Sequence, residues 1–288
     1  MIFNARFLVP ILLLTSLQSI AQKISDSTDI QSTTQVTFGT SFASKLHYFG
    51  RVDSLKSSAF IPSVSVKFTN GLYLTGSFIF VNNSNTSLAY TAAITEAGYR
   101  FGKSTGLAGS IYADKFFYTT SSELVQSVQK GQAGFSLSHL NNILDVNIGA
   151  SAVFSDKTDY FTNAGVDHQF RISLSNAVIL LTPTVAINAG TQNFTSTYYT
   201  TKRNVPAFIP IGFPGTTNAT TTTVTNFQVL SYELSTPVTL VYNKFAFTVT
   251  PAYVIPQNVA AVANRPDLAA NAVNLFYTNL GLTYTLGR

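Results

Sequence analysis

The chain has 288 residues, of which 45% are hydrophobic and only 10% are charged. Soluble domains carry roughly 25% charged residues, so this composition does not supply the charged surface that a soluble protein of this size needs. The formal net charge of +5 is spread along the chain without a basic block, which argues against nucleic-acid binding. Cysteine is absent, so neither disulfides nor thiol chemistry are expected.

Residues 1–21 have the three-part layout of a secretory signal peptide. Arg6 supplies a positive charge, residues 7–14 form an apolar core, and Ser19 and Ala21 place small side chains before a cleavage site. A membrane anchor is the alternative, but the apolar core is too short to span a bilayer. We expect cleavage after Ala21, a disordered lead-in over residues 22–33, and one folded domain over residues 34–288.

The remainder of the chain alternates apolar and polar residues with a period of two, which is typical of β-strands. The clearest segment places Leu144, Val146 and Ile148 on one face, and polar or small residues on the other. The 23 Phe and 14 Tyr also favour strands. We expect twelve strands, near residues 35–42, 63–68, 72–80, 88–101, 107–113, 133–137, 144–154, 166–174, 179–187, 230–240, 245–255 and 276–286. The phase of the fourth strand is ambiguous, and we place Tyr99 outward and Glu96 inward.

Short and long connections alternate along these strands. The short ones are residues 70–71, 102–106, 139–142, 175–176 and 243–244, and the mostly longer ones are 44–58, 82–87, 114–129, 155–162, 190–223 and 256–273. Outer-membrane barrels have short periplasmic turns and longer extracellular loops. We therefore predict an all-β, transmembrane up-and-down antiparallel β-barrel of about twelve strands, with 10 or 14 as alternatives. A soluble β-sandwich is disfavoured, because the non-apolar face carries few charges.

The sequence also resembles a known group of proteins. The Ile20-Ala21-Gln22 signal end, the Thr- and Asn-rich strands and the amphipathic final segment 279–286 are similar to outer-membrane β-barrel proteins of Bacteroidota. The terminal aromatic residue that is usual in such proteins is absent. The resemblance implies integral insertion in the bacterial outer membrane, with lipid and the barrel assembly machinery as partners. It names no subfamily and no oligomeric state.

Several charged residues fall on the inward face of the predicted strands and are candidates for the lumen. They are Lys67, Glu96, Arg100, Asp145, Asp167, Arg171 and Glu233. Such charges can form a constriction that selects solutes. They can equally pair with one another, as charges inside a small barrel must. Both hypotheses stay open at this stage.

The longest loop contains an apolar, proline-rich segment over residues 204–215. Its prolines forbid a regular strand or helix, and Phe208, Ile209, Pro210 and Phe213 would be costly to expose. We expect this segment to constrict the pore, to bind a partner, or to pack against other loops as a lid.

No catalytic constellation or metal-ligand cluster is visible in the sequence, so we expect no enzyme, metal or cofactor. His47 falls in the first long loop, His139 in a short turn and His168 on the lipid side of a strand. Barrel phospholipases carry a Ser two residues after such a His, whereas Phe170 stands here. Asp167 and His168 point to opposite faces of a regular strand, so they cannot share a site.

The leading function hypothesis is a narrow passive channel for small hydrophilic solutes. A barrel of twelve strands lies between the filled eight-stranded barrels and the open channels of 16 to 18 strands. A non-transporting surface or assembly protein whose long loops bind a partner is the alternative. An enzyme carried by the barrel is the third possibility.

Overall fold

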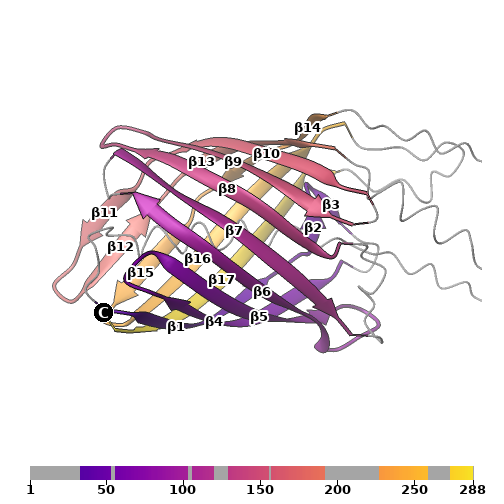
Figure 1. The fold of residues 1–288 in the computed structure, drawn as a ribbon. Helices are drawn as coiled ribbons and strands as arrows, with labels where there is room; N and C mark the ends of the chain where they lie inside the picture. The colour runs from indigo at the N-terminus through magenta and orange to yellow at the C-terminus, as the bar shows by residue number, and fades with distance from the viewer. Residues whose placement is uncertain are drawn as a thin grey trace, which may run out of the picture.

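The computed structural model describes residues 33–52, 56–102, 106–119, 129–155, 157–191, 227–258 and 273–287. Over these ranges the chain is all-β and forms a closed antiparallel barrel of twelve strands (Figure 1). None of the described residues belongs to a helix that could cross a membrane. The predicted fold class and strand number are confirmed.

Nine strands of the wall are continuous: β1 (Gln35–Ala43), β4 (Ser58–Lys67), β5 (Leu72–Asn82), β6 (Ala89–Gly102), β7 (Gly106–Tyr118), β8 (Gly131–Leu140), β9 (Asp145–Phe154), β16 (Phe245–Pro256) and β17 (Leu275–Leu286). The other three are interrupted into β10 (Asp159–Asp167) with β11 (Phe170–Ser173), β12 (Ala177–Leu181) with β13 (Thr184–Gly190), and β14 (Gln228–Ser235) with β15 (Val238–Tyr242). The short hairpin of β2 (His47–Tyr48) and β3 (Arg51–Val52) lies within the first connection.

The first and last strands close the barrel. Phe38 of β1 lies opposite Tyr284 of β17 on one side and Val64 of β4 on the other. Every other wall strand pairs with its neighbours in chain order. Closure suits a membrane, because a strand edge exposed to lipid leaves backbone groups without partners. The β11–β12 hairpin extends past β9, since Asp167 already lies opposite Asp145, the first residue of β9.

The outer surface of the barrel is apolar. Leu72, Leu74 and Phe78 are each about half exposed along β5, and comparable side chains continue around the wall. This is the outward apolar band of a membrane-spanning barrel. The phase predicted for the fourth strand is correct, because Tyr99 is 39% exposed whereas Glu96 is 7% exposed and faces inward.

The predicted lipid-facing side is wrong for one residue. In the predicted strand over residues 230–240 the alternation places Leu230 on the lipid-facing side with Tyr232 and Leu234, but Leu230 is fully buried. The β13–β14 register shifts between Asn188 and Ala189, which pair with Ser231 and Val229 and leave Leu230 as an extra residue between them. Such a β-bulge redirects the side chain, here into the barrel.

The alternation of short and long connections also has an exception. β10 begins at Asp159, so the β9–β10 connection covers only residues 155–158 and is no longer than the turn over residues 141–144. The expected loop over residues 155–162 is therefore wrong, because Asp159 and Tyr160 already pair with β9. The other connections at that end remain longer, including residues 44–57, 191–227 and 257–274. We refer to the two ends as the long-loop end and the short-turn end.

Candidate solute path and the loop that crosses it

Much of the lumen wall is built from small hydroxyl side chains. They hydrogen-bond in cross-strand pairs: Ser65 with Thr75, Ser110 with Ser136, and Thr239 with Thr248, each at 2.9 Å between oxygens. These residues sit on the strand face opposite the lipid-facing one, as the alternation predicts. The result is a hydrophilic inner surface with short side chains.

An acidic cluster lies on the inner faces of β5 to β8. Glu96 of β6 and Asp114 of β7 lie directly opposite each other and are 7% and 8% exposed. Glu96 accepts a hydrogen bond from the Tyr73 hydroxyl. The Arg100 guanidinium stacks over the Tyr73 ring at 4.4 Å from its centroid and interacts electrostatically with Glu96. The Arg100 guanidinium therefore interacts with both the Tyr73 ring and the Glu96 carboxyl group.

Polar atoms of this cluster remain without a protein partner. Gln132 of β8 lies opposite Asp114 and donates through Nε2 to the Tyr112 hydroxyl at 2.9 Å. Gln132 Oε1, Asp114 Oδ1 and Arg100 Nε are buried and have no partner among the described residues. Buried polar atoms left unpaired are costly, so this wall favours a solute or water that donates to the two oxygens and accepts from the Arg100 N–H.

The other predicted lumen acids are held by hydrogen bonds. Asp167 accepts a bond from the Asn147 amide, and Asp145 accepts one from the backbone N–H of Asn141 at 2.8 Å. Glu233 accepts a bond from the Tyr277 hydroxyl, with 2.9 Å between the oxygens. Each of these three carboxyl groups therefore accepts a hydrogen bond from a neutral donor.

The inward faces of the described strands are acidic on balance. Their carboxyl groups are Glu96, Asp114, Asp145, Asp159, Asp167 and Glu233, and their cations are Lys67 and Arg100. The sequence predicts Arg171 to face the lumen. In the structure it lies in β11, whose residues are all exposed and which extends past the end of β9. The lumen thus has the opposite sign to the chain, whose formal charge is +5.

The first connection enters the barrel. At its neck, Ser44 N–H donates to Thr278 O at 3.0 Å, and Leu46 N–H donates to Ser57 O. Between these anchors the chain turns back through β2 and β3, with positive φ at Phe49 and Gly50. Figure 1 places this hairpin within the barrel, toward the end opposite the C-terminus. We call the described residues of this connection, 44–52 and 56–57, the inserted loop.

Successive residues of the inserted loop contact different sides of the lumen. Leu46 packs in an apolar cluster with β1 and β4 to β7, which includes Ile79. Tyr48 packs with the inner faces of β9, β10 and β14, and its ring meets Phe161 edge-on at 6.1 Å between centroids. Val52 packs against β16 and β17. The loop therefore crosses the lumen near the long-loop end.

Gly50 fits this arrangement because it has no side chain. Its φ of +84° suits glycine, and an added Cβ would lie 2.5 Å from Pro256 Cγ and 3.0 Å from Val254 Cγ1. The backbone of the hairpin therefore rests directly on β16. A larger residue here would have to push the hairpin away from the wall.

His47 is the titratable group of the inserted loop and is almost completely buried, at 2% exposure. Its ring lies 4.3 Å from the Tyr277 ring, and its Nδ1 accepts a hydrogen bond from Gly50 N–H at 3.3 Å. Burial, with a smaller contribution from nearby Lys45, lowers the pKa of His47 to about 3. The docked hairpin therefore requires a neutral imidazole.

Sequence reasoning missed the inserted loop. It considered a constriction, a partner site or a lid only for the segment over residues 204–215, whose Phe208, Ile209, Pro210 and Phe213 lie outside the described residues. The signal for the actual loop was the run of Leu46, His47, Tyr48 and Phe49, which is too apolar for an exposed loop. No group of His, Cys, Asp and Glu among the described residues has the arrangement of a metal site.

No protein-family model and no curated protein sequence matches the chain. Solved structures of similar shape include the KdgM porin, at 10% identity and a TM-score of 0.44, covering 87% of this chain and 98% of the porin. LpxR from Salmonella typhimurium is 11% identical with a TM-score of 0.46, covering 86% and 99%. An outer-membrane channel from Pseudomonas putida F1 is 12% identical with a TM-score of 0.42, covering 91% and 99%.

Proposed function

We propose that this chain is an outer-membrane channel for small hydrophilic solutes, with a preference for cations, and that the inserted loop closes it in the state described here. The observation that most supports this proposal is a polar, acidic lumen that an apolar loop crosses near one end. The Bacteroidota-type subfamily and the signal peptide over residues 1–21 remain predictions beside it.

Charge supports the cation preference. The acidic cluster places two carboxyl groups opposite each other, and the carboxyl groups on the inward faces of the described strands outnumber the cations there. Rings of acidic side chains favour cations in channels. The hydroxyl-lined wall and the unpartnered Gln132 Oε1 and Asp114 Oδ1 suit solutes that donate hydrogen bonds.

The inserted loop supports a gated path. Its side chains replace water with apolar contacts on several sides of the lumen, and a hydrophobic constriction blocks ions by excluding water. Passage then requires the hairpin to leave its site. Loops of this kind move on timescales of nanoseconds to milliseconds, far shorter than a bilayer recording.

The test replaces residues 45–56 with a short Gly-Ser linker and compares this variant with the wild type in planar bilayers under a potassium chloride gradient. We expect rare openings in the wild type and sustained conductance in the variant. The reversal potential of the variant should show potassium preference. An anion-selective variant would refute the selectivity, and a variant that never conducts would favour a non-transporting surface protein.

A further inference from the structure

Three Thr-Pro pairs lie side by side on neighbouring strands. Thr182-Pro183 separates β12 from β13, Thr236-Pro237 separates β14 from β15, and Thr250-Pro251 lies within β16. The register aligns them, because Thr184 pairs with Ser235, and Ser235 in turn pairs with Ala252. His168, between β10 and β11, continues the row, and its N–H donates to Pro183 O at 3.3 Å.

The row produces a groove on the outer wall. Proline lacks an N–H and interrupts the hydrogen-bond ladder, which accounts for the breaks between β12 and β13 and between β14 and β15. On the lipid-facing side the row presents Pro183, Thr236 and Pro251, which are shorter than the neighbouring Leu234 and Tyr253. A trough therefore forms between taller side chains.

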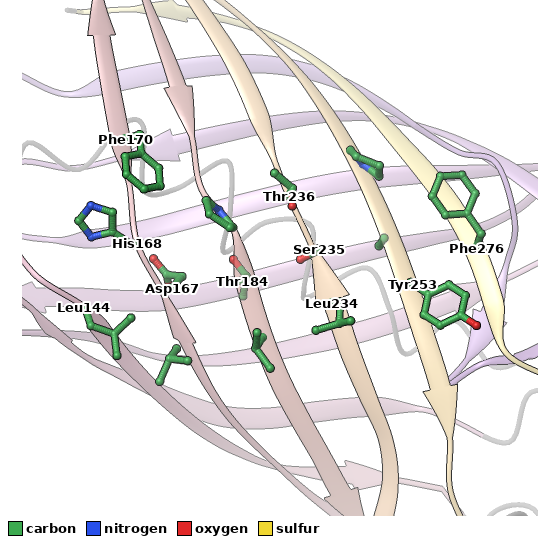
Figure 2. Close-up of a pocket in the computed structure, with 15 residues that line it drawn as sticks. Leu144, Asp167, His168, Phe170, Thr184, Leu234, Ser235, Thr236, Tyr253 and Phe276 are labelled. Carbon is green, nitrogen blue, oxygen red and sulfur yellow. The ribbon is translucent and has the colours of Figure 1, made fainter.

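The groove has a volume of about 550 Å³ and is almost entirely apolar (Figure 2). Its borders include Val185, Leu234, Tyr253, Phe170 and Phe276, all between 37% and 56% exposed. The row crosses four strands, from the β10–β11 break to β16. At about 4.8 Å between strands this is about 14 Å, close to one leaflet of hydrocarbon, which is about 15 Å thick.

The groove has a polar end. Asp167 pairs with Asp145, so the next residue, His168, lies across from Leu144, the last residue of the turn over residues 141–144 at the short-turn end. The His168 imidazole is on the lipid-facing side, edge-on to the Phe170 ring with 4.5 Å between centroids. An ionisable side chain on a lipid-facing wall is costly unless it has a polar partner.

We propose that the groove binds one acyl chain of a phospholipid from the periplasmic leaflet, with its phosphate or ester oxygens at His168. The location of the groove indicates which molecule would occupy it. The groove opens on the membrane-facing wall, where bilayer lipids are the molecules present, and an empty apolar trough would forfeit dispersion contacts. Its length matches one chain, and its histidine lies at the short-turn end, where headgroups of that leaflet would be.

The absence of tryptophan from the chain permits a clean reporter. Leu234→Trp places a single indole at the groove, and Leu282→Trp places one on the lipid-facing side of β17, which does not line it; the two leucines are 46% and 44% exposed. Folded, delipidated barrels in detergent are titrated with phosphatidylethanolamine whose acyl chains are brominated. We expect saturable quenching with one lipid per barrel for Leu234→Trp and only weak, linear quenching for Leu282→Trp.

Two further variants separate a built site from an ordinary lipid coat. Thr236→Phe fills the floor of the groove and should abolish saturable quenching, whereas Thr95→Phe, an exposed position on the outer face of β6, should leave it unchanged. His168→Leu should weaken binding about tenfold, as expected for loss of one hydrogen bond to a charged group. Equal, non-saturating quenching at both reporters would overturn the proposal, and this readout is independent of whether the barrel conducts.

Discussion

Removing the Tyr48 ring should open the lumen. Tyr48 is 2% exposed and packs with Val153, Phe161 and Leu230 from three wall strands. Truncating a buried aromatic side chain to alanine costs roughly 3 kcal/mol or more. If that ring is buried only while the loop is docked, Tyr48→Ala should raise the ratio of undocked to docked loop roughly 100-fold, at 1.4 kcal/mol for each tenfold change.

The assay is the open probability of single barrels in planar bilayers at a fixed voltage. Tyr160→Ala is the matched control, because Tyr160 adjoins Phe161 on the same strand but is 57% exposed on the lipid-facing side. We expect long openings for Tyr48→Ala and wild-type behaviour for Tyr160→Ala. If Tyr48→Ala stays folded and as silent as the wild type, docking of Tyr48 does not control conduction.

The remaining predictions concern the same loop and its surroundings. The pKa of buried His47 is lowered to about 3 from 6.5, so its contribution to docking is complete above pH 6.5 and declines as the pH falls toward 3. At pH 4.5 this loss should raise the open probability roughly 100-fold, and His47→Phe should remove this pH dependence. Gly50→Val should open the channel by steric displacement, whereas Gly76→Val, whose added Cβ would meet nothing within 4 Å, should not. Tyr277→Phe removes the hydroxyl that donates to the Glu233 carboxyl group of β14. Urea unfolding in lipid vesicles should therefore show a free energy of unfolding lower by about 1.5–3 kcal/mol.

The barrel itself could be predicted because its determinants are local. Alternation with a period of two sets which side chains meet lipid, and Leu72, Leu74 and Phe78 follow it without deviation. Leu230 does not, because a bulge depends on the register with the neighbouring strand, which the pattern of one strand cannot specify. The short β9–β10 connection was missed for a similar reason, since Asp159 gains its strand conformation from pairing with Val153.

The functional features depend on contacts distant in sequence. Leu46 and Tyr48 are visible as an apolar stretch, but their partners lie on strands throughout the chain. The Thr-Pro pairs can also be read in the sequence, yet only the sheet register shows that Pro183 and Pro251 align across neighbouring strands. Composition and periodicity therefore do not specify which residues contact one another across a closed barrel.

A reversible disulfide between the hairpin and the wall tests most directly whether the inserted loop closes the channel. The chain has no cysteine, and Val52 of the hairpin packs against the wall cluster that contains Val254 of β16, so Val52→Cys with Val254→Cys pairs two thiols without adding a side chain at Gly50. Conductance of this double variant is recorded before and after reduction in the same bilayer. We predict no openings while the disulfide is formed and the return of openings after reduction; equal open probability in both states would contradict the account.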